Sequence, residues 1–178
     1  MIVPKTSPTQ SQVDTLALLA KYEIKTKVAI LGVRGHYSEM GESGKNDRGI
    51  YDDAIFILAP DCYLSFNANC DPGKFKKGIA TLNTGIWYYK VGMHGLNKPS
   101  SLRYRALIQA EKFTVTRDGL GEDTGYFGIN IHKGGYATVS SLGCQTIHPD
   151  QWVSFIETIK AQLEKHDQRT VPYVLVEV

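Results

Sequence analysis

Short runs of β-branched, aliphatic and aromatic residues recur along the chain and alternate with turn-forming residues. Runs of this length are typical of strands and too short for most helices. Pro60-Asp61 and Asp118-Gly119 predict turns between neighbouring runs. Strands are predicted over residues 27–33, 54–58, 63–67, 85–91, 106–110, 113–116, 128–132 and 173–176. The chain is therefore expected to be mainly β.

Helices are predicted only near the two ends of the chain. Ser11 and Asp14 have the spacing of a capping box, which predicts a short helix over 12–22. Its apolar face is predicted to comprise Val13, Leu16, Ala17 and Ala20. Pro149 is a favourable first-turn residue for a second helix. An amphipathic stripe follows it, made of Trp152, Phe155, Ile156, Ile159 and Leu163.

The length of 178 residues is that of one domain, so we expect an N-terminal arm and short helix over 1–25 and a single β-rich domain over 26–178. Apolar residues make up 42% and charged residues 21%, which is typical of a folded chain and excludes extensive disorder. The net charge of +2 argues against a nucleic-acid-binding protein. No apolar run reaches the roughly 20 residues of a membrane span.

The cysteines and the N-terminus bear on compartment and cofactors. Three cysteines are present, Cys62, Cys70 and Cys144, and none forms a CxxC pair, which argues against a zinc ribbon or a redox motif. His36, Glu39 and Glu42 do not have the spacing of a standard metal site. We therefore expect no metal and no cofactor. The N-terminus lacks the pattern of a classical signal peptide, so synthesis in the cytoplasm is expected.

The segment 128–147 combines the residues of a cysteine nucleophile and its base. His132 ends a predicted strand, two glycines follow Lys133, and Cys144 comes twelve residues after the histidine. A cysteine reacts as a thiolate, and a neighbouring imidazole commonly produces it. We therefore predict that the loop 133–143 brings His132 next to Cys144 and that Cys144 is the most reactive thiol near neutral pH.

This segment resembles the catalytic motif of the YkuD-type L,D-transpeptidases. That family has a strand ending in His-Gly, a loop, and then Ser-His-Gly-Cys followed by a hydrophobic residue and Arg or Asn. The matching residues are His132, Ser141, Gly143 and Cys144. The segment 80–89 also resembles the family's Thr-Pro-Thr-Gly-x-Tyr strand entry. The resemblance implies an L,D-transpeptidase-like β-sandwich with a short N-terminal helix and a C-terminal amphipathic helix.

The sequence departs from the family pattern at four points. Leu142 replaces the motif histidine, and Lys133 replaces the glycine after the catalytic histidine. Gln145-Thr146 replaces the hydrophobic-Arg/Asn pair, and the loop between histidine and cysteine is shorter. The nucleophile and base therefore transfer from the family, whereas the arginine that follows the cysteine does not.

The resemblance implies a role for each matching residue. Cys144 attacks a peptidoglycan stem peptide and forms a thioester, and His132 takes and returns the proton. The Lys133 carbonyl holds the second imidazole nitrogen, and the N–H groups of Gly143 and Cys144 form the oxyanion hole. Ser141 belongs to the same motif. The thioester then passes to an amine or to water, so transpeptidase and carboxypeptidase activity both remain open.

Recognition of a stem-peptide carboxylate requires a basic residue from another segment, because Thr146 carries no charge. The candidate substrate-binding residues are Gly134, Thr146, Arg34, Arg48, Arg105, Arg117 and His94, with Arg103 as a further possibility. For His94, a solvated position in a loop is the alternative interpretation.

Two rival functions remain. One is a Cys/His amide hydrolase that acts on a non-wall substrate. The other is a non-catalytic binding module of a phage or a secretion system on the same fold. Under the wall-enzyme hypothesis, the site of action is the periplasm or the cell wall after non-classical delivery, as for a phage product or an antibacterial effector. The sequence leaves the oligomeric state open.

Overall fold

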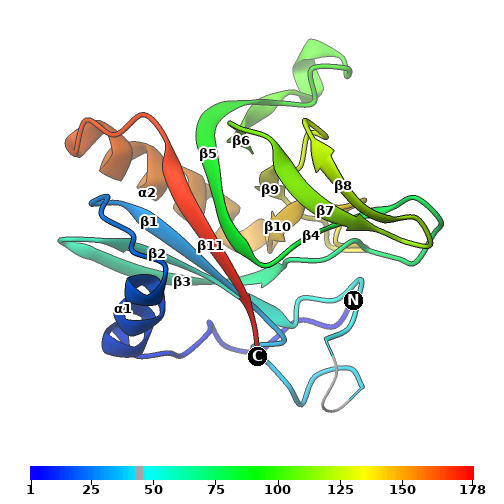
Figure 1. The fold of residues 1–178 in the computed structure, drawn as a ribbon, viewed down its shortest axis with the longest axis horizontal. Helices are drawn as coiled ribbons and strands as arrows, with labels where there is room; N and C mark the ends of the chain where they lie inside the picture. Colours follow the sequence, from blue (N-terminus) through cyan, green and yellow to red (C-terminus); the bar gives the residue numbers. More distant parts are fainter. Residues whose placement is uncertain (43–45) are drawn as a thin grey trace.

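Eight strands close into a barrel in the computed structural model, which describes residues 1–42 and 46–178 (Figure 1). Around the barrel the order is β1-β11-β5-β6-β9-β10-β3-β2. The pairs β1–β11 and β9–β10 are parallel, and the remaining neighbours are antiparallel. The barrel strands are β1 (Ala29–Arg34), β2 (Asp53–Ala59), β3 (Cys62–Asn69), β5 (Gly85–His94), β6 (Tyr104–Gln109), β9 (Ile131–Lys133), β10 (Gln145–Ile147) and β11 (Val171–Glu177).

A small antiparallel sheet lies beside the barrel (Figure 1). It consists of β4 (Ala80–Leu82), β7 (Phe113–Arg117) and β8 (Gly121–Gly125). The helices are α1 (Gln12–Lys21) and α2 (Trp152–Lys165), with single 3-10 turns at Ser100–Leu102 and Pro149–Gln151. Neither of the helices in the described part of the chain has the length and apolar character needed to cross a membrane.

The mainly β architecture with a helix near each end confirms the predicted fold class. Every predicted strand overlaps an observed one, although the strand expected at 128–132 covers Ile131–Lys133. Three strands were not predicted: β4, β8 and β10. The larger sheet closes on itself, which differs from the two packed sheets of the expected sandwich.

Helix α2 supplies one wall of the main core. All five residues of its predicted stripe are buried. They pack in one cluster with inward-facing strand residues such as Ile30, Phe66 and Tyr173. Phe155 meets Phe66 edge-on, with ring centroids 5.3 Å apart. The 3.6-residue period of the stripe therefore corresponds to real burial.

Helix α1 packs through a different face from the predicted one. Thr15 and Leu19 are buried, whereas Val13 is 74% exposed and Leu16 is 51% exposed. The Thr15 hydroxyl lies 2.9 Å from Tyr63 Oη, and Leu19 joins a second core cluster against the outer faces of β1 and β2. Both faces of β1 and β2 are therefore covered, which explains why every residue of the two strands is buried.

Candidate active site

His132 and Cys144 lie at the adjoining ends of the parallel strands β9 and β10. Thr146 pairs with His132, and the Gln145 N–H donates to the Asn130 carbonyl at 2.9 Å. Gln145 pairs with Ile131, so the same register places the preceding residue, Cys144, opposite Asn130. Because side chains alternate along a strand, this register places Cys144 and His132 on the same face of the sheet, with Cys144 two positions before the partner of His132. A shared sheet face is one condition for the predicted pair, whose side-chain contact stays a prediction, because no hydrogen bond joins these two described side chains.

The imidazole of His132 is held in a single tautomer. Its Nδ1 lies 2.9 Å from the Lys133 carbonyl oxygen, as the sequence predicted. Because a carbonyl only accepts hydrogen bonds, Nδ1 carries the proton and Nε2 has the free lone pair of a base. The Tyr104 hydroxyl also lies 3.4 Å from Nδ1. His132 is thus oriented as a general base.

The environment of His132 keeps the ring neutral. The side chain is 5% exposed. Burial, reinforced by neighbouring His94, lowers the pKa of His132 to about 4. A base with this pKa is unprotonated at neutral pH, as proton abstraction requires.

The sulfur of Cys144 is held by the backbone of the preceding loop. Its Sγ donates to the Gly128 carbonyl at 3.4 Å and accepts the Asn130 N–H at 3.4 Å. Burial raises the pKa of the Cys144 thiol, and the Asn130 N–H partly offsets that rise. Thiol and imidazole are therefore both neutral in the resting protein. This differs from the predicted imidazole-stabilised thiolate, because a neutral His132 offers no positive charge, and the proton must move during attack.

Alkylation of Cys144 by iodoacetamide is expected to be slow at neutral pH and to accelerate only above the ordinary pKa of a cysteine. The raised pKa of the Cys144 thiol is the reason, since only the thiolate reacts. Peptide mapping of labelled protein across a pH series measures the rate. Cys62 is the internal comparison, because it is partly exposed and burial also raises its pKa. Rapid labelling of Cys144 at pH 7 contradicts a neutral resting thiol.

The turn before Cys144 depends on Ser141 and Gly143. The Ser141 hydroxyl donates to the Cys144 carbonyl at 2.6 Å and accepts the Gly143 N–H at 3.0 Å. Gly143 has a φ of +133°, and a Cβ on it would lie 2.6 Å from the Ala80 carbonyl oxygen. Only glycine fits this position.

The same turn corrects the predicted oxyanion hole. The Gly143 N–H is occupied by Ser141 Oγ, so it does not point freely toward a substrate. The Cys144 N–H donates to no group in the described parts of the chain. Of the two expected donors, the Cys144 N–H is therefore the one available to an oxyanion.

Gln109, which the sequence did not single out, fixes the loop that holds the sulfur. Its side-chain oxygen accepts three consecutive N–H groups, from Phe127 at 3.0 Å, Gly128 at 2.9 Å and Ile129 at 3.2 Å. Its side-chain nitrogen donates to the Gly125 carbonyl at 2.7 Å. One amide thereby sets the path of the residues that contact Cys144. No local pattern identifies such a residue, because its partners are distant in sequence.

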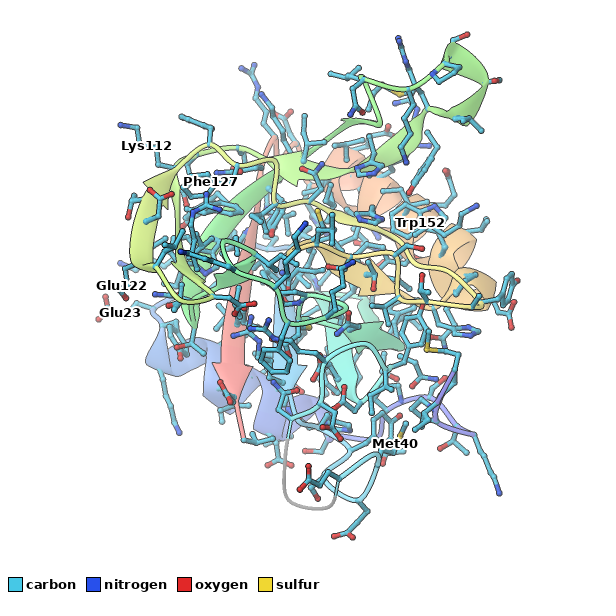
Figure 2. All side chains as sticks on the ribbon, turned by 90° about the vertical axis from the view of Figure 1, so that its right-hand side faces the viewer. Glu23, Met40, Lys112, Glu122, Phe127 and Trp152 are labelled. Carbon is cyan, nitrogen blue, oxygen red and sulfur yellow. The ribbon has the colours of Figure 1, made fainter. Side chains whose placement is uncertain are left out.

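Two clefts border the segment 126–130. An uncharged cleft of about 530 Å³ is lined by Tyr126, Gly128 and Asn130 from this segment, together with His94 and neighbours of the β5–β6 hairpin. A basic cleft of about 420 Å³ is lined by Phe127 and Ile129 from the same segment. Phe127 lies beside β8 in Figure 2. The basic cleft also includes Leu142, Lys74, Lys76, Lys77 and Arg117.

Arg117 is the candidate arginine that reaches a cleft beside the Cys144 turn. It lines the basic cleft with Leu142, two residues before Cys144. Its guanidinium lies 4.7 Å from the Phe127 ring centroid and forms an ion pair with Asp123 at 2.7 Å. The three lysines of the cleft come from the turn-rich segment 70–78, which the sequence analysis did not select.

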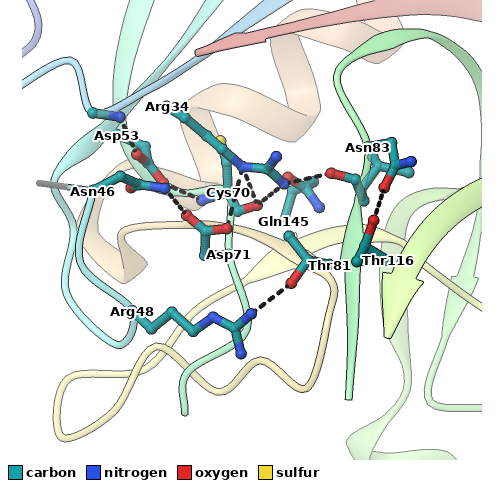
Figure 3. Close-up of polar contacts among 12 residues, drawn as sticks. Arg34, Asn46, Arg48, Asp53, Cys70, Asp71, Thr81, Asn83, Thr116 and Gln145 are labelled. Atoms are coloured by element: carbon teal, nitrogen blue, oxygen red, sulfur yellow. Dashed lines mark hydrogen bonds and ion pairs between the residues drawn. The ribbon is translucent and has the colours of Figure 1, made fainter. Parts of the chain in front are cut away.

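Three other candidate arginines have different surroundings. Arg34 is 4% exposed; it contacts Asp71 at 3.2 Å and donates to the carbonyls of Cys70 and Leu82, so its role is structural (Figure 3). Arg48 pairs with both oxygens of Asp118 at 2.7 and 2.8 Å. Arg105 lines a separate cleft with residues of α2. None of these three arginines lines either cleft beside the segment 126–130.

Of the remaining candidates, some contact the His132 ring and others have packing roles. His94 stacks on His132, so it belongs to the site. Gly134 is required for packing, because a Cβ there would lie 2.1 Å from Tyr51 Oη. Thr146 is fully buried and cannot touch a substrate. Lys133 contributes its carbonyl to His132, while its ammonium lies 5.6 Å from the Tyr104 ring centroid.

Among the described residues, no group of three His, Cys, Asp or Glu side chains is arranged to hold a metal ion. Comparisons with protein-family models, with curated proteins and with solved structures find no match to this chain.

Proposed function

We propose that the chain is a cysteine enzyme that transfers or hydrolyses a peptide acyl group through a thioester on Cys144. The observation that carries the proposal is the arrangement of His132. Its Nδ1–H is fixed on the Lys133 carbonyl, and its free Nε2 belongs to a ring on the same sheet face as the Cys144 sulfur. A nucleophile beside an oriented base is the requirement for this chemistry.

The proposed reaction begins with two neutral groups. As Sγ of Cys144 attacks the amide carbon, Nε2 of His132 takes the thiol proton. The Cys144 N–H donates to the developing oxyanion, and one such donor typically contributes about 2.7–4 kcal/mol of transition-state stabilisation. The imidazolium then returns the proton to the leaving nitrogen as the C–N bond breaks. Water or an amine attacks the thioester and releases Cys144.

The proposed substrates are peptidoglycan stem peptides. The resemblance to L,D-transpeptidases supports this choice, and so does a basic cleft next to the nucleophile's turn, which suits a carboxylate-bearing peptide. We propose an L,D-transpeptidase-like fold, with transpeptidase or carboxypeptidase activity at the cell wall or in the periplasm. Delivery by a non-classical route, as for a phage product or an effector, belongs to the same proposal.

Charge reversal of Arg117 to glutamate is expected to raise KM for a carboxylate-bearing peptide by about tenfold or more, a typical magnitude for a lost charge-assisted hydrogen bond. The KM for the amidated analogue is expected to change little. Steady-state kinetics on both peptides measure the difference. Arg105→Glu is the matched control, because Arg105 lines a separate cleft. Equal changes for both peptides contradict carboxylate recognition by Arg117.

Incubation with purified muropeptides followed by mass spectrometry tests the proposed activity. The expected products are stem peptides shortened at an amide bond or joined to an added amine. Intact muropeptides together with turnover of other peptide amides support the non-wall hydrolase instead. Absence of turnover with every amide supports the binding module.

A further inference from the structure

His94 lies directly against the candidate base. It is the last residue of β5, where the β5–β6 hairpin leaves the barrel (Figure 1). Its ring stacks on His132 with centroids 4.2 Å apart and an interplanar angle of 24°. The ring of His94 also contacts the ring of Tyr104, with centroids 5.4 Å apart. The base is therefore confined by His94 on one face of its ring.

The amide of Asn130 fixes which nitrogen of His94 carries a proton. The Gln109 backbone N–H donates to Asn130 Oδ1 at 3.2 Å, which assigns the orientation of the amide. Asn130 Nδ2 then faces His94 Nδ1 at 3.1 Å as a donor. His94 Nδ1 must accept this bond, so neutral His94 carries its proton on Nε2.

Asn130 also connects His94 to the nucleophile. Its backbone N–H donates to Cys144 Sγ at 3.4 Å, while its side chain donates to His94. Asn130 thus contacts the sulfur through its backbone and the second imidazole through its side chain, and that imidazole stacks on the base.

We propose that His94 is a positioning residue, which fixes the ring of His132 by stacking and excludes a second positive charge beside it through the donor amide of Asn130. This inference rests on the proposed function for its effect on turnover. Its structural part, the two tautomers and the stacked pair, does not depend on activity.

The charged and titratable groups around the pair favour this arrangement. Burial lowers the pKa of His94, and the nearby charge of Lys98, from the β5–β6 hairpin, lowers it further. Tyr104 contacts both imidazoles, Lys133 places its ammonium over the Tyr104 ring, and Cys144 lies across the strand pair. Protonation of His94 at Nδ1 would place an N–H against the Asn130 NH₂ group. A neutral pair is therefore the compatible state.

Imidazole nitrogen NMR on the full chain tests the structural part directly. His94 is expected as the Nε2–H tautomer and His132 as the Nδ1–H tautomer. Asn130→Asp keeps the oxygen that accepts the Gln109 N–H but replaces the NH₂ donor facing His94 with a second acceptor oxygen. His94 is therefore expected to become protonated at Nδ1 near neutral pH. A wild-type His94 that carries its proton on Nδ1, or an Asn130→Asp variant in which Nδ1 of His94 stays unprotonated, overturns the proposal.

His94→Phe tests the functional part, because phenylalanine keeps a stacked ring and removes the charge and the Nδ1 acceptor. The pKa of His132 is expected to rise, so the acid limb of kcat/KM moves to higher pH. His94→Ala also removes the stacked ring, and in this variant we expect kcat to fall by about 10- to 100-fold through loss of positioning, with little change in KM. His36→Phe is the matched control, since His36 packs on the ring of Phe56.

The outcomes separate this proposal from the proposed function. An unchanged kcat in His94→Ala, or an unchanged acid limb in His94→Phe, overturns the positioning role. If the wild-type chain turns over no amide, the proposed function fails. The NMR pKa of His132 in His94→Phe still decides the inference: a rise supports the coupling, and an unchanged value overturns it.

Discussion

Replacing Cys144 with alanine is expected to lower kcat/KM for a muropeptide by about 10⁴-fold or more, because the covalent route through the thioester is lost. The free energy of unfolding is expected to change much less than activity does, since the thiol's two hydrogen bonds to described residues are long, both at 3.4 Å. Product analysis by mass spectrometry gives the rates, and thermal unfolding checks that the variant is folded.

Cys62→Ala is the matched control for this change. Cys62 is partly exposed, as Cys144 is, but it lies at the start of β3. Its replacement is expected to leave kcat/KM unchanged. Comparable losses in the two variants would show that Cys144 is not the nucleophile.

Replacing His132 with alanine is expected to lower kcat by about 10²- to 10⁴-fold, the usual contribution of a general base. In the wild-type protein, burial lowers the pKa of His132 to about 4. The neutral, active form of the base therefore exists above that pH and is lost as the pH falls through about 4. A pH profile of kcat/KM measures this limb, which should be absent in His132→Ala. A wild-type limb near the ordinary histidine pKa contradicts the buried base.

The parts of the fold that the sequence predicts correctly are those with a local period. The stripe of α2 repeats every 3.6 residues and faces the core as expected. Helix α1 begins with the predicted cap, with Ser11 Oγ accepting the Asp14 N–H at 3.0 Å. Its buried face was wrong because a distant contact decides it: Thr15 bonds Tyr63 on β3 and is buried despite its hydroxyl.

The missed strands form through pairing rather than through local propensity. β8 reads Gly-Glu-Asp-Thr-Gly, which contains few β-forming residues. It is a strand because it pairs with β7, and the hydroxyls of Thr114 and Thr124 lie 2.9 Å apart across the pair. Barrel closure likewise depends on β1 pairing with both β2 and β11, which are distant in sequence from each other.

The candidate site shows the same division. The bond from His132 to the Lys133 carbonyl joins adjacent residues, and the sequence predicted it. Gln109, Asn130 and the stacking of His94 depend on segments that meet only in the folded chain. The sequence proposed several basic residues without choosing among them, and the structure places Arg117 in the cleft beside the Cys144 turn.

Intact-protein mass spectrometry after a rapid acid quench with a carboxylate-bearing stem peptide is the most direct test of the central claim. A mass increase equal to the acyl fragment is expected on Cys144, and it should be removed by hydroxylamine and absent from Cys144→Ala. Cys62→Ala is expected to retain the adduct. Turnover without any acyl-protein, or an adduct that persists in Cys144→Ala, would contradict a thioester on Cys144.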